Sequence, residues 1–494
     1  MNRRTPAILV LLLAIVLTAW GCNSGGGGGG SGGLASADRI AAVAEMSGSE
    51  TVVVGGAAGT VSPGSAVTIT NLANSETRQV SASSDGGFEA VFNTPTSATF
   101  RVEIPADGVD ETIGVTLLRD AVDRDLAALG SVPADIGILD GRAYVVNGFS
   151  DNIQVFDITT FPPIQVGTIA LPQGQNPGTI TFIDNSRAAV PNSIGQSIAI
   201  VNLQTLACET MVANEPGDFS PCANAVVIPG AFEDPSGIAS ASGKLWVTNN
   251  NLGPDFNPIG NGFITVIDLD SLALDGFFIP ATGTNPGSPM VINGRVWVLN
   301  SGNILFDPAT VTFSCDPSLP PSVDIINPLS ATIETTIPIP LSAANPTVCL
   351  PGALAPTPDG QSAYLGLGLA AAMLKIDVPS RTLVRGTDNP IVLTDLADLN
   401  LSADIVIRPD GLGFVSLFNT DQIAVFDTSN DEANPFPFIS PFPGGLAADD
   451  PASLLFSGVQ SLALASTGQF PDIFYITGLS QQLNSIDTSL VLAP

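Results

Sequence analysis

The sequence predicts an all-β chain in two parts, a small β-sandwich followed by a seven-bladed β-propeller. Three observations carry this prediction. The 494 residues include 50 glycines and 40 prolines, which supply the turns that many short strands need. Short alternating apolar strands begin after residue 50. After residue 130 an apolar strand ending in Asp or Asn recurs seven times, and all-strand repeats of this length are typical of propellers.

The first residues predict export. Two arginines precede an apolar run over residues 6–20, which is shorter than the roughly 20 residues that a membrane-spanning helix needs. The stretch from Leu17 to Cys22 resembles the lipobox of bacterial lipoproteins, in which the cysteine thiol receives a diacylglycerol. This resemblance implies a signal peptide over 1–21 and a lipid anchor on Cys22. It places the protein in the cell envelope, at the outer membrane or the cell surface. The alternative is an ordinary secretory signal in which Cys22 is incidental.

Residues 22–48 are predicted to be a tether, because their Gly/Ser-rich start is flexible and would hold a folded body clear of the lipid headgroups. Short strands separated by turn signals over residues 49–118 predict an antiparallel sandwich. The arrangement between Val67 and Phe88 resembles bacterial Ig-like surface modules. That resemblance implies a spacer or an adhesion unit, of which we favour the spacer.

The repeats define a predicted propeller over residues 119–494. The seven strand endings are Asp157, Asn202, Asp268, Asn327, Asp377, Asp427 and Asp487. The residues one and four positions before each ending are apolar and fall on opposite faces of a strand. Both faces are therefore predicted to be buried, as in a sheet packed between two neighbours. Asp and Asn suit the first position of a turn, which predicts turn chemistry at these positions and no row of catalytic carboxylates.

A second repeated unit lies upstream of each ending and consists of a small turn followed by a strand. Its copies at Tyr144–Asn147 and Trp246–Asn249 resemble the YVTN family of propeller repeats. This resemblance implies a β-propeller architecture, but it identifies no catalytic or binding residues in this chain. Too few residues follow Asp487 to form an outer strand. We therefore expect residues about 124–131 to supply that strand and to close the ring.

Composition excludes several classes of function. The formal net charge is −31 and the chain has no histidine. Nucleic-acid binding needs a cationic face, so no nucleic-acid partner is expected. Because the chain has no histidine, it cannot use a histidine-activated nucleophile or bind a metal through histidine ligands.

The cysteines predict disulfides in an oxidising compartment. If Cys22 is lipidated, four cysteines remain, and four cysteines allow three pairings. The near-neighbour solution joins Cys208 to Cys222 and Cys315 to Cys349, each pair bracketing a loop that contains Pro and Asp. The alternative is four free buried thiols.

Three groups of residues are candidates for chemistry, and each has a structural interpretation. The pairs Asp268/Asp270 and Asp449/Asp450 suit acid–base work or a calcium site, but no calcium-loop motif is present. We interpret them as solvated turn carboxylates and predict no cofactor, with Ca²⁺ as the alternative. Trp246 and Trp297 fit core packing better than a sugar platform. Four asparagines that end the second unit form either a polar rim or turns: Asn147, Asn192, Asn249 and Asn300.

The sequence therefore predicts a lipid-anchored, non-enzymatic protein of the cell envelope, whose propeller binds a protein or a glycan. Residues 206–235 and 301–322 are the predicted recognition face, because binding residues concentrate on loops carried by a rigid scaffold. Lactonases are the enzymes nearest in fold to YVTN-like repeats. The alternative function is thus a lactonase-like or other hydrolase that acts at the propeller funnel.

Overall fold

A computed structural model describes most of the chain after residue 39. The described residues are 40–44, 51–56, 61–83, 87–95, 97–117, 122–253, 258–276, 278–307, 312–393, 402–418, 422–429, 431–433, 459–465, 473–477 and 481–486. The predicted signal peptide, Cys22, Asp449 and Asp450 lie outside them. The described part of the chain contains no helix that is long and apolar enough to span a bilayer.

The N-terminal domain is a seven-stranded sheet in the order β4-β3-β6-β7-β1-β2-β5. Its strands are β1 (Ala41–Ala44), β2 (Thr51–Gly56), β3 (Ala66–Asn71), β4 (Thr77–Ser81), β5 (Phe88–Asn93), β6 (Thr99–Ile104) and β7 (Val109–Leu117). The first part of β7 pairs with β6 and its last residues pair with β1, while the edge strands β4 and β5 contact each other. The sheet thus folds back over one core, which includes Ile69, Phe92 and Phe100.

Two details of this domain correct the sequence prediction. The predicted tether over 22–48 contains β1, which pairs with both β2 and β7, so the folded domain begins before residue 49. The β1–β7 pair is parallel, whereas an antiparallel arrangement was expected. The resemblance to Ig-like modules remains a prediction.

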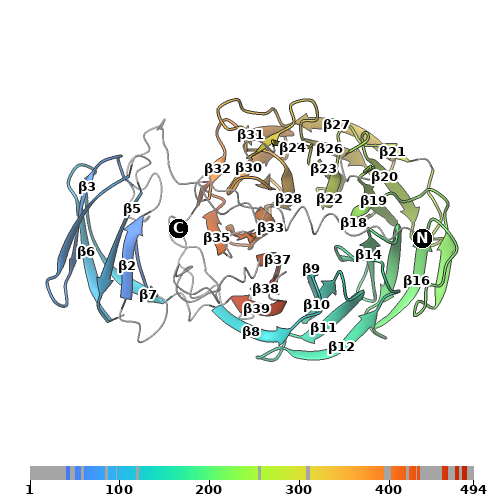
Figure 1. Cartoon of the computed structure of the whole chain (residues 1–494), viewed down its shortest axis with the longest axis horizontal. Helices are drawn as coiled ribbons and strands as arrows, with labels where there is room; N and C mark the ends of the chain where they lie inside the picture. The colour runs from blue at the N-terminus through green and yellow to red at the C-terminus, as the bar shows by residue number, and fades with distance from the viewer. Residues whose placement is uncertain are drawn as a thin grey trace.

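The other described strands form seven sheets of four or five strands around a ring, one for each predicted repeat, and one separate two-stranded hairpin (Figure 1). The chain is all-β with a β-propeller, as predicted. Blade 1 contains β9 (Pro133–Leu139), β10 (Arg142–Asn147), β11 (Asn152–Asp157) and β12 (Ile164–Ala170). Blade 2 contains β13 (Thr181–Phe182), β14 (Arg187–Asn192), β15 (Ser197–Asn202), β16 (Ala207–Ala213) and the extra strand β17 (Asn224–Val227). Blade 3 contains β18 (Pro235–Ala241), β19 (Lys244–Asn249), β20 (Phe263–Asp268) and β21 (Ile279–Pro280).

Blades 4 to 7 follow the same order from the centre of the ring outward. Blade 4 contains β22 (Pro286–Ile292), β23 (Arg295–Asn300), β26 (Ser322–Asn327) and β27 (Thr332–Pro338), with the inserted hairpin β24 (Ile304–Asp307) and β25 (Thr312–Cys315), and blade 5 contains β28 (Pro351–Pro356), β29 (Ser362–Leu367), β30 (Ala372–Asp377), β31 (Thr382–Arg385) and β32 (Ile391–Val392). Blade 6 contains β33 (Ser402–Ile407), β34 (Leu412–Leu417), β35 (Gln422–Asp427) and β36 (Glu432–Ala433). Blade 7 contains β37 (Val459–Leu464), β38 (Ile473–Thr477), β39 (Gln482–Ile486) and β8 (Val122–Ala128).

The repeated apolar positions are the core of the ring. The residues one position before each ending are all 0 % exposed: Phe156, Val201, Ile267, Ile326, Ile376, Phe426 and Ile486. The residues four positions before are also all 0 % exposed: Ile153, Ile198, Ile264, Val323, Met373, Ile423 and Leu483. Burial on both faces of the third strand confirms that each sheet packs between two others.

The first strand of the propeller region closes the ring. β8 pairs antiparallel with β39 as the outer strand of blade 7, with Ala128 opposite Gln482 and Val122 opposite Ile486. The predicted closure by residues near 124–131 is therefore confirmed, with the strand two to three residues earlier. Apolar residues of blades 7 and 1, among them Phe156 and Phe474, form one buried cluster across the junction.

The propeller has two ends, which we name by their turns. We call the four main strands of a blade A to D from the innermost to the outermost strand. Because neighbouring strands are antiparallel, the A–B and C–D turns lie at one end of the ring, here called the A–B end. The B–C connections and the connections from D to the next blade lie at the opposite end, here called the B–C end.

The predicted turn chemistry occurs at the A–B end. Asp157 Oδ1 accepts a hydrogen bond from the backbone N–H of Thr159 at 2.9 Å, and Asp268 Oδ1 accepts one from Ser271 at 2.9 Å. Hydrogen bonds from the Thr159 hydroxyl and backbone N–H lower the pKa of Asp157. These carboxylates are charged turn residues.

Candidate functional site

The four repeated asparagines are neither a polar rim nor turn residues, which corrects both interpretations from the sequence. Asn147, Asn192, Asn249 and Asn300 are all 0 % exposed. Each ends strand B and hydrogen-bonds within its own blade: Asn147 Nδ2 donates to Asn152 Oδ1 at 2.9 Å, and Asn300 Nδ2 donates to Asp324 Oδ2 at 2.9 Å. Their amides join strand B to strand C just below the B–C end.

Trp246 and Trp297 are core residues, as predicted. They are 0 % and 2 % exposed and belong to the apolar clusters between blades 3 and 4 and between blades 4 and 5. The indole Nε1 of Trp246 donates to the carbonyl of Ala241 at 3.2 Å, so its polar atom is satisfied inside the protein. Neither ring offers a surface for a sugar.

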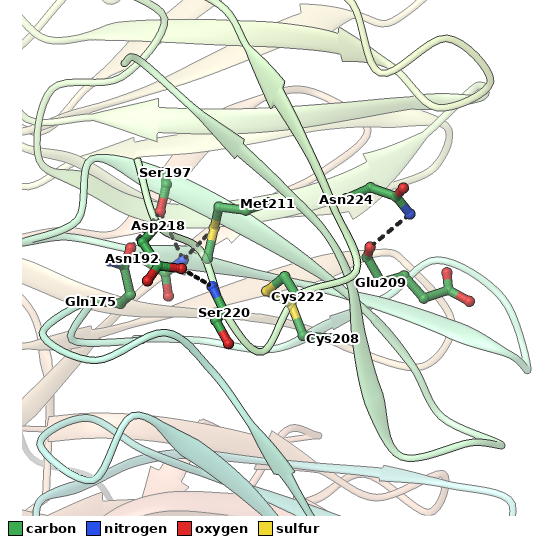
Figure 2. Close-up of a disulfide and its surroundings, with 10 residues drawn as sticks. All are labelled: Gln175, Asn192, Ser197, Cys208, Glu209, Met211, Asp218, Ser220, Cys222 and Asn224. Carbon is green, nitrogen blue, oxygen red and sulfur yellow. Dashed lines mark hydrogen bonds between the residues drawn. A yellow bond between two sulfur atoms is a disulfide. The ribbon is translucent and has the colours of Figure 1, made fainter. Parts of the chain in front are cut away.

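The predicted disulfide pairing is confirmed at Cys208–Cys222 and Cys315–Cys349. β17 runs parallel to β16, so the chain after β16 must return along the outer edge of blade 2 before β17 begins. Figure 2 shows the result: Cys222 lies against Cys208 at the start of β16, and Asn224 Nδ2 donates to the carbonyl of Glu209 at 3.1 Å. We call residues 214–234 the edge strap.

The second disulfide lies at the other end of the ring. Cys315 belongs to the hairpin inserted in the B–C connection of blade 4, and Cys349 belongs to the connection between blades 4 and 5. Beside it, Asp316 Oδ1 accepts a hydrogen bond from Ser318 Oγ at 2.6 Å, which lowers the pKa of Asp316. The predicted recognition segments 206–235 and 301–322 therefore do not form one face. The first runs mostly along an outer edge, and the second lies on the B–C end.

A different set of residues gathers on the B–C end. Among the described residues, the B–C connection of each of blades 1 to 4 carries one large exposed apolar side chain: Phe149, Ile194, Ile259 and Leu305, which are 40, 55, 67 and 46 % exposed. In blades 5 and 6 the apolar residues of the same connection, Leu369 and Phe418, are only 4 and 6 % exposed. We call the four exposed residues the apolar arc. Sequence analysis missed them, although Phe149 and Ile194 each stand two residues after a repeated asparagine.

Charge differs between the two ends. The segments that connect B to C, or D to the next blade, contain no lysine or arginine. The basic residues from β8 onward lie in strands or in A–B and C–D turns: Arg124, Arg142, Arg187, Lys244, Arg295, Lys375, Arg381, Arg385 and Arg408. Many of them form ion pairs, such as Arg295 with Glu334 at 2.9 Å and Lys375 with Asp431 at 2.7 Å. The B–C end is therefore acidic and apolar.

A pair of carboxyl groups meets at the centre of the ring, where β9, β33 and β37 run (Figure 1). Ser461 Oγ lies 2.9 Å from Asp135 Oδ1 and 2.7 Å from Asp404 Oδ2. Each carboxyl group also accepts a backbone N–H from the next blade: Ile180 donates to Asp135 at 2.8 Å and Leu462 donates to Asp404 at 2.9 Å. These contacts join blades 6, 7, 1 and 2 across the closure of the ring.

The geometry allows these two carboxyl groups to hold one proton between them through Ser461 below about pH 6. The hydroxyl of Ser461 has one hydrogen and can donate to only one of the two carboxyl groups. The second short contact is a hydrogen bond only if a carboxyl group is itself protonated. Burial, and then the charge of Asp135, raise the pKa of Asp404 to about 6, and burial also raises the pKa of Asp135. Neither residue was found from the sequence, although Asp135 directly precedes Ile136 in β9 and Asp404 directly precedes Ile405 in β33, the innermost strands of their blades.

The first of the two predicted acidic pairs, Asp268/Asp270, lies in a turn. Hydrogen bonds from the Ser271 hydroxyl and backbone lower the pKa of Asp268, which is a turn residue, and Asp270 is exposed. Among the residues that the structure describes, no group of three or more Asp, Glu, Cys or His side chains is placed to hold a metal ion. Asp449 and Asp450 lie outside those residues.

Comparison with known proteins gives the fold. No protein-family model matches the sequence, and no curated protein matches it. Among solved structures, a hydrazine synthase chain from Kuenenia stuttgartiensis is similar over 74 % of this chain and 97 % of its own, with 15 % identity and a TM-score of 0.51. A streptogramin B lyase is 11 % identical over 74 % and 97 % of the two chains, with a TM-score of 0.51. Virginiamycin B lyase from Staphylococcus aureus is 12 % identical over 74 % and 98 %, also with a TM-score of 0.51. These likenesses define the class as a β-propeller protein and carry no activity at such identities.

Proposed function

We propose that this protein is an exported, lipid-anchored propeller that binds a protein or a glycan at its B–C end and does not act as an enzyme. The apolar arc is the observation that carries the proposal. Single exposed apolar residues are ordinary on protein surfaces, but a set presented together is typical of an interaction site. Here four successive blades present one each, in the same B–C connection of the blade, on loops held by a rigid ring.

Two further features support this role. Disulfides persist in oxidising compartments, which agrees with export. The chain from the N-terminal domain enters the ring at the start of β8, opposite Ile486, and this is the A–B end of blade 7. The N-terminal side of the chain therefore joins the ring at the end opposite the apolar arc, which suits a partner that approaches the B–C end while Cys22 holds the protein at a membrane.

The alternative, a hydrolase or another enzyme acting at the funnel, is less well supported. One solved structure is described as a catalytically inactive virginiamycin B lyase in which a histidine is replaced by alanine, and this chain has no histidine. The carboxyl pair at the centre is engaged by Ser461 and by backbone N–H groups of neighbouring blades. A carboxyl pair held in this way supports the ring more readily than it serves a substrate.

Removing part of the apolar arc is expected to abolish partner capture. The double variant Phe149→Ser/Ile194→Ser should retain about a tenth or less of the wild-type capture, because central apolar contacts dominate binding energy. The measurement is crosslinking of the tagged full chain in its cells, followed by quantitative mass spectrometry of what is captured.

The matched control is Val291→Ser/Leu329→Ser, which removes two exposed apolar side chains, 41 and 81 % exposed, from the A–B end. This control should capture as much as the wild type. Loss of capture in the control but not in the arc variant would place binding at the wrong end, and the proposed binding surface would be rejected. An unchanged arc variant would reject it as well.

Lipid anchoring has its own test. Cys22→Ser should move the protein from the membrane fraction to the soluble fraction, because the acyl chains that hold it can no longer be attached. Fractionation with immunodetection measures this. Full retention of the Cys22→Ser protein on membranes would contradict the lipobox prediction without bearing on the B–C end.

A further inference from the structure

We infer that the B–C end binds a basic polypeptide surface that also carries apolar side chains. This inference rests on the proposed function and adds the chemistry of the partner. Its basis is the segregation of charge: the connections at this end hold no lysine or arginine, whereas acidic residues occur in several of them. Association is fastest and most specific when opposite potentials meet, so an acidic end favours a cationic partner.

The acidic and apolar groups adjoin each other through the edge strap. Asn214 Oδ1 accepts a hydrogen bond from the backbone N–H of Phe232 at 2.9 Å, and Asn214 Nδ2 donates to the carbonyl of Phe232 at 2.7 Å. This two-bond contact places Asn214 beside the backbone of Phe232, so Glu215 and the partly buried Glu233 follow neighbouring points of the chain at the B–C end. Asn214 Nδ2 also lies 3.3 Å from Gln196 Oε1, in the turn that carries Ile194.

These two glutamates are the carboxylates that a partner would meet. Neither forms an ion pair within the described part of the chain, and Glu215 is exposed. By contrast, the carboxylate of Asp151 accepts backbone hydrogen bonds from Gly174, Gln175 and Asn176 at 2.6 to 3.0 Å. Asp151 is thus a structural residue of the same end, and Glu215 and Glu233 keep their charge available.

Other occupants fit this surface less well. A second copy would have to offer its A–B end, whose lysines and arginines are largely held in ion pairs, or an equally acidic B–C end. An anionic lipid surface would be repelled. A neutral glycan has no positive charge to match the glutamates. A polypeptide supplies Lys or Arg together with apolar side chains, and it alone matches both features of the end.

The test is a set of four short synthetic peptides that vary charge and apolarity independently, titrated into the full chain. Their compositions are Lys with Leu, Lys with Ser, Glu with Leu, and Ser with Leu. Only the Lys/Leu peptide is expected to bind measurably. Its dissociation constant should rise about tenfold between low and physiological salt, because screening weakens exposed charge pairs. Equal binding of the Glu/Leu or Ser/Leu peptide would overturn the inference.

Variants locate the interaction. Glu215→Gln/Glu233→Gln should weaken Lys/Leu binding about tenfold at low salt and reduce its salt dependence. Asp140→Asn/Asp270→Asn, which removes two exposed carboxylates from A–B end turns, should leave binding unchanged. If both pairs of substitutions have the same effect, the attraction is a property of the overall charge, and the assignment to this end is wrong.

The two proposals can fail separately. If cell crosslinking captures a partner at the B–C end and the contacting surface of that partner is acidic or a glycan, the binding function stands and the basic-partner inference is overturned. If the Lys/Leu peptide binds as expected but cells yield no partner at this end, the surface chemistry is supported and the proposed function is overturned.

Discussion

Replacing Phe156 with alanine should lower the free energy of unfolding by about 3–5 kcal/mol, the usual cost of removing a large aromatic ring from a core. Phe156 is 0 % exposed and belongs to the cluster that joins blade 1 to blade 7, where the two ends of the ring meet. The pairing of β8 with β39 and the central carboxyl pair also hold this junction together. The loss should appear in chemical denaturation of the full chain and as a lower melting temperature.

Phe149→Ala is the matched control for Phe156→Ala. Phe149 is the same residue type, but it is 40 % exposed and lies in a B–C connection. Its replacement should change the unfolding free energy by no more than about 0.5 kcal/mol, as surface substitutions usually do. The two variants should therefore separate stability from binding: Phe156→Ala weakens the fold, and Phe149→Ala weakens partner capture. Equal destabilisation by both would contradict the assignment of Phe149 to an accessible surface.

The second large effect is on the pH dependence of stability. Folding raises the pKa of Asp404 from 3.8 to about 6, so the folded state holds a proton that the unfolded state has released. The stability that this group contributes is present below about pH 4 and is lost as the pH rises through 6. By linkage the loss amounts to up to about 3 kcal/mol.

Asp404→Asn should remove most of that pH dependence, because the variant has no group that titrates at this position. The variant keeps the shape of the side chain but carries no charge beside Asp135. The readout is the denaturation midpoint measured at steps between pH 4 and 7.

The control for Asp404→Asn is Asp157→Asn, whose carboxyl group has a lowered pKa and therefore titrates below this window. A wild-type slope that persists unchanged in Asp404→Asn, or stability that increases as the pH rises from 4 to 7, would contradict a shared proton at the centre of the ring.

The fold could be predicted from the sequence because it is repetitive. The apolar positions one and four residues before each Asp or Asn ending recur in every blade, and the packing of one blade fixes that of the next. The pairing of β8 with blade 7 could be predicted because too few residues follow Asp487 to form the outer strand of that blade. The near-neighbour disulfides followed from spacing, since Cys208 and Cys222 are 14 positions apart.

What sequence analysis missed depends on contacts between distant residues. Asp135, Asp404 and Ser461 come together only when the ring closes, although 326 positions separate Asp135 from Ser461. The sequence predicts a recognition loop at the edge strap, because the parallel pairing of β17 with β16 has no local signature. The repeated asparagines looked exposed because Asn is common in turns, and only the structure shows that their amides are buried between strands B and C.

The assignment of the B–C end as the recognition surface can be tested by photocrosslinking of the full-length protein in its cells. A photoreactive side chain is placed at Ile194, in the apolar arc, and in a separate variant at Leu329, at the A–B end. We expect the side chain at Ile194 to crosslink a specific partner and the one at Leu329 to give no product above background. A partner captured at Leu329 and not at Ile194, or captured equally from both positions, would contradict the assignment of the B–C end as the recognition surface.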